Sequence, residues 1–258
     1  MKKLTAIVLL FSAFVFSGCL DTVEELTIAK DGSGTYKTTM DMSGMFDMIE
    51  MMAAMDTSAN SQLKKLSDKD IDSTFNLSSV MDTAAGVTED QRQLYKGATM
   101  SLTMKQKDKV FKMAMNYPFK KLEDVQKIIE LNASGKGVDI FNKGEKKQEI
   151  PPGMEDKGSM PSINNFFDIT YKKGLIERRL NETKLEDLKK DEKYSQMKSA
   201  GDMLGSITYT SILHLPKPAT KVEGAMVKLS DDKKTVTIKS TLADLFDNPK
   251  SLGFRIEY

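Results

Sequence analysis

The sequence predicts an α+β fold of antiparallel β-hairpins that alternate with helices, in which helices cover one face of a sheet. Short segments of alternating apolar and polar residues recur in pairs, and a turn-forming run of Gly, Asp or Lys separates the members of each pair. Between these pairs, apolar residues recur at helical spacing. An alternating strand has one apolar face that an amphipathic helix can cover, so a layered arrangement follows.

The amino-acid composition indicates a folded globular protein and excludes several other classes. The 258 residues are 40% hydrophobic and 29% charged, which is typical of a folded globular body. Lys and Arg total 38 against 37 Asp and Glu, and this balance argues against nucleic acid as a partner. After residue 19, no apolar run approaches the roughly 20 residues that a membrane-spanning helix needs, and no second cysteine offers a disulfide.

The first 19 residues have the form of an export signal. Lys2 and Lys3 give a cationic start, an apolar run covers residues 4–16, and the single cysteine of the chain, Cys19, follows two small residues. The run has the length of a signal-peptide core and is too short to span a bilayer. We therefore expect residues 1–18 to be a cleaved signal peptide.

The end of this segment resembles the lipobox of bacterial lipoproteins. Phe16, Ser17, Gly18 and Cys19 match it, although the family more often has Leu, Val or Ile at the first position. The resemblance implies that Cys19 is lipidated, becomes the mature N-terminus and attaches the protein to a membrane through its acyl chains, which give stable anchoring when two or more are present. Leu20 stands where many inner-membrane lipoproteins have aspartate, so we expect the outer membrane of the cell envelope.

A hairpin is expected at the start of the N-terminal part, residues 19–132. A strand over residues 22–28 follows the anchor after two or three residues, so the folded body should begin within roughly 10 Å of Cys19. The run Asp31-Gly32-Ser33-Gly34 suits a tight turn, and alternation resumes at Tyr36. A calcium loop is the weaker alternative, because later positions lack the oxygen ligands that such a loop requires.

Methionine is unusually frequent, with 18 in the chain. A predicted amphipathic helix carries four of them on one stripe: Met45, Met48, Met52 and Met55. Three interpretations compete, namely ordinary core packing, a deformable surface for a hydrophobic ligand or partner, and thioether coordination of Cu(I). Core packing is the simplest of them. The copper interpretation is the weakest, because a single histidine and no free cysteine could join the methionines. We take the four methionines as candidate ligand-binding residues.

The remaining elements are read from local patterns. In the N-terminal part these are an extended segment at 71–80, a helix from Thr88 to 96, a hairpin at 100–104 and 111–115, and a helix at 121–131. Residues 133–165 are rich in Gly, Lys and Pro, which indicates a long surface loop or linker. The C-terminal part, 166–258, should contain a hairpin at 167–180, a helix at 183–203, a strand at 206–215, a hairpin at 225–239, a helical turn at 242–245 and a final strand. Whether the two parts form one domain around one sheet is open.

Motifs for catalysis are missing from the sequence. The single histidine, His214, lies within a predicted strand, and no nucleophile elbow, zinc-ligand cluster or glycine-rich phosphate loop occurs. We expect no enzyme and no cofactor. The sequence favours a lipid-anchored envelope protein that binds a hydrophobic ligand or lipid, and the alternative is a structural or assembly component with protein partners in the envelope. An enclosed apolar cavity of several hundred Å³ would favour the first, and a filled core would favour the second.

Overall fold

The computed structural model describes residues 20–44, 46, 70–83, 87–133, 163–190, 194–195, 198 and 207–258. Strands of one sheet are β1 (Leu20–Ile28), β2 (Gly34–Asp41), β3 (Ile71–Asn76), β4 (Thr99–Lys105), β5 (Val110–Phe119), β8 (Ile207–His214), β10 (Val227–Leu229) and β11 (Thr235–Thr241). Strands of a second sheet are β6 (Phe167–Lys172), β7 (Leu175–Leu180), β9 (Lys221–Glu223) and β12 (Phe254–Glu257). The helices are α4 (Leu77–Thr83), α5 (Glu89–Leu94), α6 (Glu123–Ala133), α8 (Glu182–Lys189) and α10 (Leu242–Asp247), with 3-10 helices η1 (Ile163–Phe166) and η2 (Pro249–Leu252).

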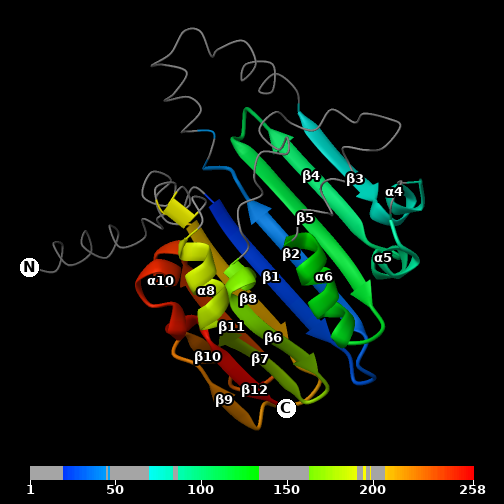
Figure 1. Ribbon diagram of the computed structural model, residues 1–258. Coiled ribbons are helices and arrows are strands. Elements are labelled where there is room, and N and C mark those ends of the chain that lie inside the picture. Colours follow the sequence, from blue (N-terminus) through cyan, green and yellow to red (C-terminus); the bar gives the residue numbers. More distant parts are fainter. Residues whose placement is uncertain are drawn as a thin grey trace, which may run out of the picture.

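The large sheet has eight strands in the order β10-β11-β8-β1-β2-β5-β4-β3, and the small sheet has four in the order β6-β7-β12-β9 (Figure 1). The α+β prediction is confirmed. The predicted hairpins are present as the antiparallel pairs β1–β2, β4–β5, β6–β7 and β10–β11. Their turns are local in sequence, which explains why pattern alone finds them.

The expectation of purely antiparallel pairing is wrong at one place. β1 and β8 pair in parallel, from Leu20 beside Ile207 to Thr27 beside His214. Alternation along a strand does not reveal the direction of its neighbour, and a parallel pair needs a long connection, which the intervening chain provides. Strands from both sides of the predicted linker therefore lie in one sheet.

The main core lies between the large sheet and a second layer that contains the small sheet and α6 (Figure 1). Leu26, Tyr117 and Leu213 come from the large sheet and Ile176 and Ile256 from the small one. α6 adds an apolar stripe, Val125, Ile128 and Ile129, from the predicted helix. The sequence predicts helices as the cover of the sheet, whereas here a sheet and a helix share that face.

Helix boundaries differ from the prediction in two places. The predicted extended segment 71–80 is strand only to Asn76, because the Asn76 side chain accepts a hydrogen bond from the Ser78 backbone N–H at 2.9 Å and α4 begins. The predicted helix 183–203 is α8 as far as Lys189, with residues 194, 195 and 198 also helical. At α5 the predicted N-cap is confirmed, since Thr88 accepts from the Gln91 backbone N–H.

Candidate functional site

Five methionines gather on one face of the large sheet, and we call them the methionine face: Met40 of β2, Met100 and Met104 of β4, and Met113 and Met115 of β5. Strand register sets Met40 opposite Met113 and Met100 opposite Met115. Opposed side chains have Cβ atoms about 4.5 to 5.5 Å apart, so these thioether chains are neighbours across the strands.

The methionine face continues the core face of the sheet. Met100 and Met115 pack against the main core cluster. Met104 is buried, whereas Met40, Met100, Met113 and Met115 keep part of their surface exposed. Unbranched thioethers adapt to irregular apolar shapes. These side chains therefore form an apolar and deformable surface that is neither sealed core nor fully exposed.

The site residues predicted from sequence lie outside the described part of the chain. This holds for Cys19 and for the stripe of Met45, Met48, Met52 and Met55, so both remain predictions. The methionines on the strands were visible in the sequence as two apolar hairpin faces. Their meeting across three strands depends on register, which the sequence pattern does not contain.

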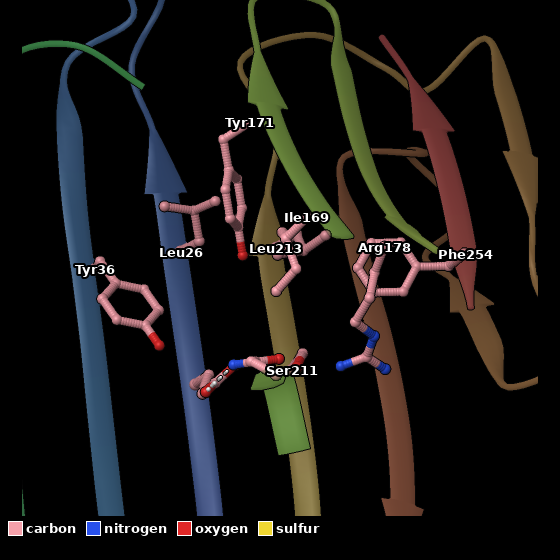
Figure 2. A pocket seen from close by; sticks show the side chains of 10 residues that line it. Leu26, Tyr36, Ile169, Tyr171, Arg178, Ser211, Leu213 and Phe254 are labelled. Atoms are coloured by element: carbon pink, nitrogen blue, oxygen red, sulfur yellow. Dashed lines mark hydrogen bonds between the residues drawn. The ribbon is translucent and has the colours of Figure 1, made fainter. Parts of the chain in front are cut away.

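A polar cluster interrupts the core between the two sheets. Glu24 of β1, Asn164 of η1, Arg178 of β7 and Ser211 of β8 line one small space (Figure 2). Side chains alternate along a strand, so Glu24 shares a face of β1 with Leu26 and enters the core. Arg178 enters from the opposite sheet by the same alternation, on the face of Ile176.

Arg178 is the most enclosed charged side chain of this cluster, with 5% of its surface exposed. Its Nε donates a hydrogen bond to the Leu252 carbonyl at 2.9 Å, and its guanidinium lies 4.9 Å from the centre of the Phe254 ring and 5.1 Å from that of Phe167. Burial lowers the pKa of Arg178 from its usual value, while the Glu24 carboxylate acts in the opposite direction. Stacking between two rings suits a weakly hydrated, planar cation.

Glu24 faces this cation from the large sheet. Burial raises the pKa of Glu24, although the charge of Arg178 and hydrogen bonds from Tyr36, Asn164 and Ser211 all lower it. The Asn164 side-chain amide donates to Glu24 Oε1 at 3.2 Å. Figure 2 shows the polar ends of Tyr36 and Arg178 turned toward the same space.

The enclosed space is small, about 10 Å³, which is room for roughly one water molecule. An organic ligand needs a cavity of about 300 Å³ or more. The polar cluster therefore joins the two sheets electrostatically, and it is not a ligand pocket.

A second hollow is a shallow surface depression of about 390 Å³ beside the small sheet. Its lining is rich in charged side chains, several of which form ion pairs. Arg255 contacts Glu177 at 3.0 Å and Glu257 at 2.9 Å, and Lys250 contacts Glu182 at 2.9 Å. Because its lining is charged, the depression is a poor site for an apolar ligand.

His214 lies on the face of the large sheet that is turned away from the core, as its predicted polar position implies. Its Nε2 is 2.8 Å from Glu25 Oε1, and its Nδ1 is 3.4 Å from the Thr235 hydroxyl. Within the described residues, no group of three or more His, Cys, Asp and Glu side chains could hold a metal ion. In that same part of the chain, no helix has the length and apolar character to cross a membrane.

Comparisons with known proteins add little. The sequence matches no protein-family model and no curated protein. Among solved structures it is similar to the folded domain of LppM from Mycobacterium tuberculosis, determined by NMR, with a TM-score of 0.34 and 9% sequence identity over 95% of this chain and 94% of that one. A likeness at this level supports no conclusion about fold or function.

Proposed function

We propose that the protein is a lipid-anchored protein of the cell envelope that binds a hydrophobic ligand, and that this ligand is the acyl chain of a lipid. The observation that carries the proposal is the position of the methionine face beside the edge of the sheet at which β1 begins. β1 starts at Leu20, the residue after Cys19. Lipidation of Cys19 would hold this edge against the membrane.

The distances favour exchange with the bilayer. Asp21, Asp41 and Lys112 share one register row across β1, β2 and β5, and Met40 and Met113 lie one residue beyond it, away from Cys19. Strand residues rise about 3.3 Å each, so the methionine face begins roughly 7 Å along the sheet from Leu20, the first described residue. An acyl chain leaving the membrane would meet thioether side chains almost at once.

The methionines predicted from sequence remain part of the proposal, although they lie outside the described residues. Met45, Met48, Met52 and Met55 follow β2, whose last residue, Asp41, lies at this edge. We include them in the proposed site. The described methionine face presents apolar thioether chains, and the space at the polar cluster has room for roughly one water molecule, so we propose binding without catalysis and without a cofactor.

The proposal is tested with a soluble form that starts at Leu20. Native mass spectrometry of the purified protein should detect a bound lipid or fatty acid. Met100→Asp should abolish this binding, because a carboxylate against an acyl chain is costly to desolvate. The matched control is Ser101→Asp, which places the same charge on the opposite face of the same strand.

A Met100→Leu variant separates binding from folding, since this exchange nearly conserves volume and should keep both. A protein that carries no extractable lipid, and whose melting temperature does not change when fatty acid is added, would contradict the proposal.

One observation favours the alternative, a structural or assembly component that binds other envelope proteins. The cavity at the polar cluster between the two sheets is only about 10 Å³. If protein side chains cover the methionine face as well, the five methionines are core residues. Met100→Asp should then unfold the protein, and the purified wild-type protein should carry no ligand.

The anchor and its location have their own tests. Cys19→Ser should abolish incorporation of labelled fatty acid and leave uncleaved or soluble protein. Labelled fatty acid on that variant would refute lipidation at Cys19. Membrane fractionation should find the wild-type protein in the outer membrane.

A further inference from the structure

We infer that the polar cluster between the two sheets is a binding site for one water molecule, which accepts a hydrogen bond from Arg178 Nη2 and donates one to the Glu24 carboxylate. This water links a charged side chain of the small sheet to one of the large sheet. The site is independent of the proposed binding of lipid at the methionine face.

One nitrogen atom of Arg178 needs a hydrogen-bond acceptor. Nη2 is buried and has no hydrogen-bond partner among the described residues, whereas Nε of the same side chain donates to the Leu252 carbonyl at 2.9 Å. The whole side chain is only 5% exposed. A buried donor on a charged group is costly to leave unpaired, and bound water commonly supplies the missing partner of a buried polar atom.

The surroundings of the guanidinium limit where this acceptor can lie. The ring centres of Phe254 and Phe167 are 4.9 and 5.1 Å from the guanidinium carbon. Guanidinium N–H bonds lie in the plane of the group, and these rings offer them no oxygen or nitrogen acceptor. Figure 2 shows the guanidinium end of Arg178 turned toward Ser211, and both side chains line the same small space. The acceptor for Nη2 is therefore placed in this space.

The space suits one water molecule in size and in lining. Its volume of about 10 Å³ is room for roughly one water. Glu24, Ser211 and Tyr36 also line it and bring a carboxylate and two hydroxyl groups. Glu24 Oε1 accepts from the Asn164 side-chain amide at 3.2 Å, and a carboxylate has about four lone-pair sites, so Glu24 can also accept from water. A buried water typically makes about three hydrogen bonds, which these groups can provide.

Charge favours water over an ion at this position. An anion would meet the Glu24 carboxylate, and a cation would meet the Arg178 guanidinium, since both side chains line the space. An additional charge in the core is costly unless it is paired. Water is neutral, and it can accept from the guanidinium and donate to the carboxylate at the same time.

The test compares two substitutions of Ser211. Ser211→Ala removes the hydroxyl and leaves room for the water, whereas Ser211→Val adds apolar volume and displaces it. Filling a dry cavity with apolar atoms gains stability, but displacing a bound water leaves Arg178 Nη2 without an acceptor. Thr210→Ala and Thr210→Val are the matched controls, because Thr210 lies on the opposite face of β8 and reports the different strand propensities of Ala and Val.

Full-length protein made in cells and purified in detergent is unfolded by heat and followed by circular dichroism. After subtraction of the difference between the two Thr210 variants, Ser211→Val should melt at least about 2 °C below Ser211→Ala. A corrected melting temperature of Ser211→Val that equals or exceeds that of Ser211→Ala would mean that the space is dry, and it would overturn the inference.

A high-resolution crystal structure of the same protein locates the water directly. We expect electron density within hydrogen-bond distance of both Arg178 Nη2 and the Glu24 carboxylate in the wild type, and its loss in Ser211→Val. A wild-type map without density at this position contradicts the inference. Anomalous scattering there from crystals soaked in bromide also contradicts it, because the site would then bind an anion.

Discussion

Arg178→Met should be one of the most destabilising single changes in the described part of the protein. The change keeps an unbranched chain but removes the hydrogen bond to the Leu252 carbonyl and the stacking on two rings. It also leaves the Glu24 carboxylate in the core without its counter-charge. Glu24 and Arg178 are not in direct contact, but each charge stabilises the other across the small space between the sheets. Loss of the charge that compensates a buried carboxylate costs up to about 3 to 5 kcal/mol.

That loss is large beside a typical folding free energy of about 5 to 15 kcal/mol. For a domain of this size the melting temperature falls about 2 to 4 °C per kcal/mol, so we expect a decrease of about 6 to 20 °C. Urea unfolding and calorimetry measure the two quantities. The control is Arg179→Met, because the next residue of β7 points to the opposite, exposed face and should change stability by less than about 0.5 kcal/mol.

A double-mutant cycle identifies the cause. Glu24→Gln combined with Arg178→Met removes both charges, and it should recover a substantial part of the loss, because neutral replacement of a whole buried pair is often tolerated. The reasoning is refuted if Arg178→Met is no worse than Arg179→Met. It is also refuted if the effects of the Glu24 and Arg178 changes simply add.

Three smaller predictions concern local physics. Burial raises the pKa of Glu24, so its contribution to stability is fully present below the unfolded pKa of about 4.5 and is lost as pH rises through the folded pKa. The free energy of unfolding of wild type minus that of Glu24→Gln should therefore fall as pH rises over this range. A flat or rising difference in urea titrations contradicts this prediction. Gly34→Ala should disrupt the β1–β2 pair, since its Cβ would lie 1.9 Å from the Thr27 carbonyl oxygen, whereas Gly32→Ala meets no atom within 4 Å and costs only the strain of a positive φ; equal melting temperatures for the two variants would show the hairpin yields there. Thr241→Ala removes the N-cap of α10 and should cost about 1 kcal/mol in chemical unfolding, and no measurable loss would mean that this cap is redundant.

Local signals account for the parts of the fold that the sequence predicts. The β1–β2 hairpin follows from Asp31-Gly32-Ser33-Gly34, where Gly32 takes a φ of 90° and Asp31 Oδ1 accepts from the Ser33 backbone N–H at 3.0 Å. The start of α5 follows from Thr88. In both cases the residues that form the turn or cap lie within a few positions of one another in the sequence. A local sequence pattern is therefore enough to predict the structure.

Nonlocal pairing accounts for what sequence reasoning missed. Alternation places Arg178 on the same face of β7 as Ile176, so the sequence contains the hint of a core charge. Its meaning depends on Glu24, far away in the chain, and on the parallel pairing of β1 with β8, which sets Glu24 beside Ser211. No periodicity reports contacts at such separation.

The methionine face could not be predicted from the sequence for the same reason, because its residues come from strands that are distant in the chain. The helical spacing of Met45, Met48, Met52 and Met55 is visible within one segment of the sequence. The methionines of β2, β4 and β5 are spread over three strands, and register alone brings Met40 beside Met113 and Met100 beside Met115. Composition indicates that methionine is abundant, and strand register places five of the methionines on one face of the large sheet.

Photocrosslinking with a fatty acid that carries a diazirine on its acyl chain tests the central claim most directly. The labelled lipid is added to cells that make the full-length protein, and the crosslinked peptides are identified by mass spectrometry. We expect crosslinks on core-facing residues of β4 and β5, such as Met100 and Met113, and their loss in Met100→Asp but not in Ser101→Asp. Crosslinks confined to Cys19 and its immediate neighbours, with none on these strands, would contradict the proposal that the methionine face binds lipid.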